Sequence, residues 1–426
     1  MSDILSPTAP ASPSGHDRPD DVLLSPDVLR ARFAQAMSDL YRQEVPQYGA
    51  LLELVGAVNA EQPHPPEERV AVERHGAIRL GTAAELSGMR RLFAAFGMRP
   101  VGYYDLSPAG VPVHSTAFRP VTTEALARNP FRVFTSLLRL DLIADPGLRA
   151  EAEAILRNRD IFAPGVLATA DRAAGAGGLS QREAQDFIQG ALHSFRWHDT
   201  APVSGTLYRR LRAAHPLIAD VVCFRGPHIN HLTPRTLDID AVQAGMAARG
   251  MNPKASIEGP PRRQVPILLR QTSFKALEEP IRFTGGPADD EAGTHTARFG
   301  EVEQRGVALT PKGRALYDRL LADAQADGGP GALEKHFAAF PDDAPSLLRE
   351  ELAFFREGDP GRPVTYEDFL PVSAAGIFRS NLGDAAGNDA RAASPRREMF
   401  VQALGAEPLD EMRLYRIEAE GSTATV

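Results

Sequence analysis

Residues 69–97, RVAVERHGAIRLGTAAELSGMRRLFAAFG, predict a strand followed by a helix, and this order decides the fold class that we expect. The first part, 69–80, has the side-chain alternation of a strand. Thr82 and Glu85 then form the Thr-x-x-Glu pattern with which many helices begin. The helix should end at Gly97, because glycine readily adopts the left-handed conformation that closes a helix.

Three strand-like segments follow this helix, at about residues 99–106, 111–121 and 131–143. The order strand, helix, strand, strand, strand resembles the module from which vicinal-oxygen-chelate metalloenzymes build a curved sheet around a metal. We therefore expect an α+β fold with a vicinal-oxygen-chelate-like, curved, mixed β-sheet around a metal centre, flanked by helices.

A similar order of elements recurs later in the chain. We expect a strand at about 219–234, a helix at 238–250 and extended stretches at 264–271, 279–285 and 297–308. The recurrence concerns the order of elements and not their sequence. Residues from the two halves could then converge at one pseudo-two-fold centre.

Helices are predicted at both ends of this region. Ser25 and Pro26 provide an N-cap and a first helical residue, and further helical patterns occur at about 47–60, 311–324 and 344–356. The first two helices should cover a sheet, whereas the C-terminal helices should form a lid over the site.

The domain organisation follows from these elements. Residues 1–24 are rich in Ser, Pro, Ala and Asp and predict a disordered tail. A catalytic metal-binding domain should span 25–385, with a helical insert at about 146–215 and a helical lid from about 310. Residues 386–426 should form a C-terminal extension.

The composition bounds the classes of partner. A chain of 426 residues with 43% hydrophobic residues can bury a large core. Its net charge of −8 and the lack of a Lys/Arg block argue against nucleic acid as a partner. No run of about eighteen apolar residues occurs, which argues against a membrane span. The N-terminal residues lack a secretory signal pattern, so we expect a cytoplasmic protein.

A single cysteine, Cys223, excludes an intrachain disulfide framework and a multi-cysteine zinc site. It stands in the apolar run ADVVCF, where a buried free thiol is expected rather than a nucleophile.

Two histidines and a glutamate are the candidate metal ligands. His75 lies in the first predicted strand, His231 in GPHINHLTPRTLDID (226–240) and Glu301 in ARFGEVEQRG (297–306). Two neutral imidazoles and one carboxylate can hold Fe(II) on one face and leave adjacent positions open for substrate and O2.

Two neighbouring residues are alternatives for this set. Glu303 shares a strand face with Glu301 and competes for the carboxylate role. His228 precedes His231 by three residues and could replace it, or it could orient a ligand imidazole through the second ring nitrogen. The sequence leaves both alternatives open.

Strand alternation also places Arg79 on the same face as His75. Its guanidinium could hold a substrate carboxylate through two parallel hydrogen bonds, which a lysine could not do. The alternative is a salt bridge at the rim of the site.

Five separated motifs resemble the 2-oxoadipate dioxygenase/decarboxylase family over about residues 27–385. They are ERHGAIRLGT (73–82), GPHINHLTPRTLDID (226–240), LRQTSFKALEEP (269–280), FGEVEQRGVALT (299–310) and FLPVSAAGIFRSNLG (369–383). The resemblance implies a non-haem Fe(II) enzyme that converts 2-oxoadipate and O2 to (R)-2-hydroxyglutarate and CO2, a late step of bacterial lysine breakdown. By motif, it implies His75, His231 and Glu301 as iron ligands and Arg79 as the catalytic, substrate-binding arginine.

Substrate specificity would depend on the distal carboxylate of a 2-oxo dicarboxylate, with Arg79 as the first candidate to bind it. Gln271, Ser273, Val372 and Ser373 are further candidates for lining or closing the pocket, and strand or loop packing is the alternative for each. A non-oxidative isomerase, lyase or hydrolase of the vicinal-oxygen-chelate type, acting on a 2-oxo acid, is the alternative function. The sequence leaves the oligomeric state open.

Overall fold

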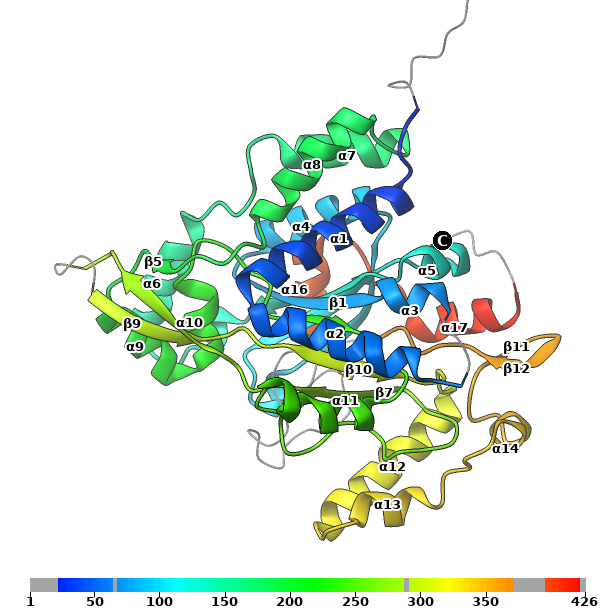
Figure 1. Ribbon diagram of the computed structural model, residues 1–426. Coiled ribbons are helices and arrows are strands. Elements are labelled where there is room, and N and C mark those ends of the chain that lie inside the picture. Colours follow the sequence, from blue (N-terminus) through cyan, green and yellow to red (C-terminus); the bar gives the residue numbers. More distant parts are fainter. Residues whose placement is uncertain (1–21, 64–66, 287–290, 371–394, 422–426) are drawn as a thin grey trace, which may run out of the picture.

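The computed structural model describes residues 22–63, 67–286, 291–370 and 395–421, and it has the predicted α+β class (Figure 1). Its largest sheet has five strands in the order β2-β3-β4-β1-β6. These strands are β1 (Arg74–Leu80), β2 (Arg99–Asp105), β3 (Val113–Arg119), β4 (Arg132–Leu138) and β6 (Leu232–Pro234). Strand β1 runs parallel to β4 and antiparallel to β6, so the sheet is mixed, as predicted.

The segment that opens this sheet begins with a helical turn. Residues Glu68–Val72 form the short helix α3, so the strand predicted from residue 69 begins only at Arg74. The turn brings Arg69 to within 3.3 Å of Glu73, an i,i+4 ion pair that an extended chain would separate.

The helix after β1 confirms the predicted capping pattern. Helix α4 spans Ala83–Ala95, and Thr82 and Glu85 make both hydrogen bonds of the capping box. Gly97 follows with φ 67°, the left-handed conformation expected at its end.

The later strands form two separate units instead of a second copy of the large sheet. Strand β7 (Leu269–Ser273) pairs with β10 (Glu301–Arg305). Strands β8 (Glu278–Phe283) and β9 (Glu291–Thr296) form a hairpin that pairs with β5 (Thr200–Ala201). Figure 1 shows this hairpin on the left, away from β7 and β10. The predicted order of elements is present, but the β8–β9 hairpin leaves the central sheet.

The strand predicted at 219–234 is wrong over most of its length. Residues Pro216–Val222 form the helix α10, whose N-cap His215 accepts a hydrogen bond from the Leu217 amide. Proline in the first turn favours this helix, although the β-branched residues of ADVVCF favour a strand. Only the last three residues of the predicted strand, in β6, are extended within a sheet.

Helices surround the sheets. They are α1 (Pro26–Glu44), α2 (Pro46–Ala60), α5 (Thr123–Arg128), α6 (Pro146–Arg157), α7 (Val166–Ala176), α8 (Gln181–His193), α9 (Gly205–Ala214), α11 (Ile239–Met246), α12 (Pro311–Asp327), α13 (Ala332–Phe337), α14 (Ala344–Arg349), α16 (Pro395–Leu404) and α17 (Glu411–Ala419). Helices α6 to α9 occupy the predicted insert. Helix α14 ends before the predicted 356, because the chain turns into the hairpin of β11 (Phe355–Arg356) and β12 (Asp359–Pro363).

The structure describes parts of the predicted N-terminal tail and of the predicted C-terminal extension. Residues 1–21 and 386–394 lie outside the described residues, whereas Leu24 of the predicted tail pairs with Leu179. Phe400 and Leu404 of α16 are buried in the main hydrophobic core, so this part of the predicted extension packs on the body of the protein. The lid role of the helices after residue 310 stays a prediction.

Two further expectations concern Cys223 and membrane-spanning helices. Cys223 is buried and free, and burial raises the pKa of its thiol, as suits a packing residue. Within the described ranges, no helix has both the length and the apolar character needed to cross a membrane.

Candidate metal centre

Three buried side chains from separate segments meet at one point. His75 lies in β1, His231 immediately precedes β6, and Glu301 begins β10. The Oε1 atom of Glu301 lies 2.9 Å from His75 Nε2 and 3.7 Å from His231 Nε2. All three side chains are fully buried, and one ligand atom of each lies within 4.8 Å of the others. The structure therefore brings together the three predicted metal ligands.

Backbone pairing explains how the first two come together. Strand β6 pairs with β1 so that Thr233 faces His75 across the sheet. The loop before β6 is held to the same strand by a hydrogen bond from the Asn230 amide to the Ala77 carbonyl. The buried Tyr41 hydroxyl lies 2.9 Å from the Asn230 carbonyl oxygen and ties this loop to α1. The position of His231 is thus fixed by the main chain on both sides.

The donor atoms of the three residues fit a divalent metal ion. Both ring nitrogens of His231 and the Oε2 atom of Glu301 are buried and have no hydrogen-bond partner among the residues that the structure describes. Such atoms are costly to bury, and a bound cation would satisfy them. Burial lowers the pKa of His231 to about 4, so its imidazole is neutral at pH 7 and has a free lone pair. This is the protonation state in which histidine binds a metal.

Glu303, the competing carboxylate, lies on the other side of His75. Its Oε2 atom is 2.8 Å from His75 Nδ1, and its two oxygens accept hydrogen bonds of 2.7 and 2.9 Å from Arg305. Burial raises the pKa of Glu303, but the charges of Arg305 and His75 outweigh it and lower the value to about 2. Glu303 is therefore an anion that orients His75 and leaves Nε2 directed at Glu301.

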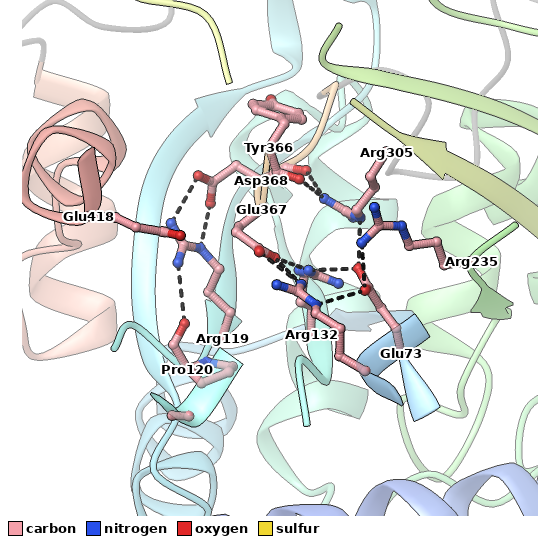
Figure 2. Close-up of polar contacts among 12 residues, drawn as sticks. Glu73, Arg119, Pro120, Arg132, Arg235, Arg305, Tyr366, Glu367, Asp368 and Glu418 are labelled. Atoms are coloured by element: carbon pink, nitrogen blue, oxygen red, sulfur yellow. Dashed lines mark hydrogen bonds and ion pairs between the residues drawn. The ribbon is translucent and has the colours of Figure 1, made fainter. Parts of the chain in front are cut away.

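A buried network of arginines and carboxylates supports this arrangement, as Figure 2 shows. Arg132 lies between Glu73 and Glu367, and Arg235 approaches Glu73 with a contact of 3.0 Å. Arg305 Nε lies 3.5 Å from Glu73 Oε1, which joins the network to the Arg305–Glu303 pair. Removing one partner of a buried ion pair leaves an uncompensated charge, so each member strongly constrains its neighbours.

Arg79 makes a buried ion pair. Its Nη1 atom lies 2.7 Å from Asp220 Oδ2, with side chains only 10% and 7% exposed. The structure thus shows the salt bridge considered as the alternative, although the pair is buried and does not lie at a rim; the substrate-binding role stays a prediction. The charge of Arg79 also contributes to the lowered pKa of His231, after burial and other neighbours, so the two groups interact electrostatically.

The remaining predicted residues have different positions. Gln271 donates a hydrogen bond of 2.9 Å to Glu301 Oε1. Ser273 lies opposite Glu301 in the β7–β10 pairing, and its buried hydroxyl has no hydrogen-bond partner in the described ranges. Val372 and Ser373 lie outside the described residues. The sequence reasoning missed Thr233, which also donates to Glu301 Oε1, at 3.1 Å. Its place two residues after His231 was the only available signal.

His228 lies in a second buried group, with Asp220 and His295. Its Nε2 atom is 3.2 Å from Asp220 Oδ1, so it approaches the partner of Arg79 and not Glu301. Neither Asp220 nor His295 was singled out from the sequence, because no local motif marks them.

Comparison with solved structures supports the fold. A putative glyoxalase superfamily protein from Ralstonia eutropha JMP134 is 17% identical and has a TM-score of 0.55, with coverage of 70% of this chain and 88% of that one. At this identity, the likeness concerns the fold alone. It agrees with the expected vicinal-oxygen-chelate-like architecture.

More similar proteins identify the family. The family model described as 2-oxoadipate dioxygenase/decarboxylase matches residues 33–381. A Pseudomonas putida protein of that name is 52% identical, with 93% of this chain and 96% of the relative covered. A crystal structure of the hydroxyglutarate synthase from Pseudomonas putida in complex with 2-oxoadipate has a TM-score of 0.84 at 49% identity and covers 94% of this chain and 97% of that one. The chain therefore belongs to the 2-oxoadipate dioxygenase/decarboxylase family.

Proposed function

We propose that this protein is an Fe(II)-dependent dioxygenase/decarboxylase that converts 2-oxoadipate and O2 to (R)-2-hydroxyglutarate and CO2. The observation that carries the proposal is the convergence of His75, His231 and Glu301, where both ring nitrogens of His231 and Oε2 of Glu301 have no hydrogen-bond partner within the described part of the chain. Two imidazoles and one carboxylate suit Fe(II) and leave coordination positions open. The names of the relatives and the 2-oxoadipate complex of the Pseudomonas putida enzyme supply the reaction and the substrate.

The protein would hold the ion with these three residues. Thr233 and Gln271 donate to the same oxygen of Glu301, which fixes the carboxylate, and no described residue bonds to Oε2. Glu303 fixes the ring of His75 through Nδ1. Bound iron would supply a Lewis acid for the 2-oxo acid and a redox partner for O2.

Arg79 would bind the distal carboxylate of the substrate. Residues 75 and 79 of one strand lie on the same face, with Cα atoms about 13 Å apart, so their side chains can reach opposite ends of a short diacid. The guanidinium is buried, which strengthens a charge-assisted hydrogen bond to a carboxylate.

The proposal is tested by O2 uptake. Protein purified without oxygen and reconstituted with Fe(II) should consume O2 on addition of 2-oxoadipate, with CO2 and 2-hydroxyglutarate identified by mass spectrometry. His75→Ala should abolish iron binding and turnover, whereas the matched control His336→Ala, at a surface ion pair with Asp327, should not. Conversion of 2-oxoadipate to a different product without O2 uptake would indicate a non-oxidative metalloenzyme, and no reaction despite bound iron would reject the substrate.

The role of Arg79 has its own test. Arg79→Ala should lower the preference for 2-oxoadipate over the monocarboxylate 2-oxohexanoate at least about tenfold, the loss expected for one charge-assisted hydrogen bond. The control Arg91→Ala removes a surface pair with Asp171 and should leave the preference unchanged. Full preference in Arg79→Ala would show that another group binds the distal carboxylate.

A cytoplasmic location and a place in lysine breakdown belong to the same proposal. A strain that lacks the protein should then grow poorly on lysine as sole carbon source. Normal growth, with no accumulation of 2-oxoadipate, would contradict this place in metabolism.

A further inference from the structure

A second buried cluster lies around Asp220, the partner of Arg79. Asp220 comes from α10, His228 from the loop before β6, and His295 from β9. Asp220 Oδ1 lies 2.9 Å from His295 Nε2 and 3.2 Å from His228 Nε2, while Oδ2 lies 2.7 Å from Arg79 Nη1. One carboxylate thus receives two imidazoles on one oxygen and the guanidinium on the other.

Polar contacts join Tyr208, His295 and Asp220 in this cluster. The Tyr208 hydroxyl donates a hydrogen bond of 3.1 Å to the Thr294 carbonyl oxygen and lies 2.9 Å from His295 Nδ1, while His295 Nε2 lies 2.9 Å from Asp220 Oδ1. Burial raises the pKa of Asp220, but the interactions with His228 and Arg79 outweigh it and hold the value well below the usual range. Asp220 is therefore an anion with fixed donors around it.

Aromatic rings fix the two imidazoles in place. Trp197 stacks on His295 with a centroid distance of 6.0 Å and meets His228 edge-on at 4.8 Å. Phe224 packs against His295 at 4.6 Å. Because both rings are packed and hydrogen-bonded, the carboxylate between them has little freedom to move.

We propose that Asp220 is a positioning residue for Arg79, and that the pair makes the site selective for 2-oxo acids that carry a second carboxylate. This inference rests on the proposed function and on the role of Arg79 in it. A free arginine side chain populates many rotamers, and ordering it on binding would weaken affinity. An immobile anion beside Nη1 orders the guanidinium before the substrate arrives.

The cluster also gives the helical insert a role. Tyr208 on α9, Asp220 on α10 and Trp197 between α8 and α9 lie in or beside the insert, and His295 lies on the β8–β9 hairpin that pairs with β5. The helical insert and the β8–β9 hairpin therefore supply side chains that surround Asp220, and Asp220 contacts Arg79.

The donor atoms of Asp220, His228 and His295 also lie within 4.8 Å of one another, which a metal site would require. One observation favours the positioning role. A cation, the guanidinium of Arg79, already lies 2.7 Å from the same carboxylate, and a metal ion there would place a second positive charge beside it.

The test compares Asp220→Asn with Glu85→Gln, a matched loss of one carboxylate from the buried pair with Arg159. Binding of 2-oxoadipate and of 2-oxohexanoate is measured by calorimetry on the metal-loaded protein under nitrogen, together with the metal content per chain. Asp220→Asn should lower the ratio of 2-oxoadipate affinity to 2-oxohexanoate affinity about tenfold or more, and it should leave the affinity for 2-oxohexanoate unchanged. Glu85→Gln should keep the ratio of the unaltered protein.

Three results would overturn the inference: an unchanged ratio, tighter 2-oxoadipate binding, or loss of a second metal equivalent in Asp220→Asn. Tighter binding would mean that Asp220 competes with the substrate for Arg79. If Asp220→Asn does not fold, Tyr208→Phe takes its place, because it removes only the hydroxyl that contacts His295. This variant should lower the ratio of 2-oxoadipate affinity to 2-oxohexanoate affinity to a smaller extent. An unchanged ratio in Tyr208→Phe would then reject the inference. Failure of the unaltered protein to bind 2-oxoadipate at all would instead reject the proposed function.

Discussion

His75 contacts two carboxylates, one at each ring nitrogen, and the two have different environments. Glu301 is bonded by neutral groups, Thr233 and Gln271, whereas Glu303 is bonded by the cation Arg305. Because Arg305 already neutralises Glu303, the less compensated carboxylate of Glu301 is better suited to a metal cation. The assignment of Glu301 as the ligand and Glu303 as its support follows from this difference.

Glu303→Gln should weaken metal binding about 10- to 100-fold, the usual effect of losing a partner that orients a ligand imidazole. The variant also leaves Arg305 with less buried countercharge, so its stability should fall as well. Metal affinity is measured by competition with a chelating dye, and stability by urea unfolding.

The control for this variant is Asp240→Asn, which removes the partner of Arg270 on the adjacent strand β7, at 2.7 Å. It should lower stability without changing metal affinity. Equal metal affinities in Glu303→Gln and in the unaltered protein would contradict the support role.

For single residues, the sequence predicted which side chains could bind a metal better than it predicted which side chains contact each other. Strand alternation correctly placed Glu301 and Glu303 on one face, but it could not decide which of them faces which nitrogen of His75. That choice depends on the position of β10 relative to β1, a tertiary contact. Asp220 could not be predicted at all, because it lies in an apolar helix and acquires its role only through Arg79, 141 positions away.

Among the elements, strand β3 carries a buried histidine against helix α16. The ring of His114 packs 4.7 Å from Phe400, and its side chain is 3% exposed. Burial, and then the charge of Arg139, lower its pKa from 6.5 to about 4. The folded protein thus binds fewer protons here than the unfolded chain between these two pH values.

Stability should therefore fall as the pH is lowered from about 6.5 to about 4, by about 3 kcal/mol for this one group. His114→Gln should remove that share of the pH dependence. The free energy of unfolding is measured by urea titration across this range, for both proteins. Parallel curves for the two proteins would show that His114 does not titrate in this way.

The approach of the loop before β6 to strand β1 depends on a glycine. A Cβ atom at Gly76 would lie 2.5 Å from Ile229 Cδ1 and 3.2 Å from the His231 carbonyl oxygen. Gly76→Ala should therefore cost about 1–3 kcal/mol of stability through overpacking and should weaken metal binding by displacing His231.

The matched double variant separates the two contacts. Valine lacks the Cδ1 atom, so Ile229→Val in the Gly76→Ala background should restore part of the stability, measured by urea unfolding. If Ile229→Val lowered stability equally in both backgrounds, the clash at Cδ1 would not be the cause.

Elements with strong local signals were predicted well, and those set by distant contacts were not. The capping box of α4 and the glycine after it fixed that helix from the sequence. The β-branched run before Cys223 suggested a strand, yet α10 forms because its apolar face packs in the core beside α9. The β8–β9 hairpin likewise depends on β5 in the insert, a pairing that no local pattern reveals.

In the whole molecule, the candidate metal centre contains residues from two sheets whose strands pair separately. His75 belongs to the five-stranded sheet, while Glu301 belongs to the β7–β10 pair. An isolated bridge between Arg235 and Glu303 is one of the backbone contacts that link them. A metal ion bound by both units would add a direct connection between them.

Metal binding should therefore stabilise the whole fold, by about 2.7 kcal/mol when free metal is at 100 times its dissociation constant. Thermal unfolding of the metal-free protein, measured with and without Ni(II) as an oxygen-insensitive substitute for iron, should show a higher midpoint with metal. Glu301→Gln should lose this rise. His336→Gln, which removes a surface histidine, should keep it and so exclude binding at an exposed site. A rise that persists in Glu301→Gln would mean that the stabilising ion binds elsewhere, because a ligand stabilises the folded state only through the site that binds it.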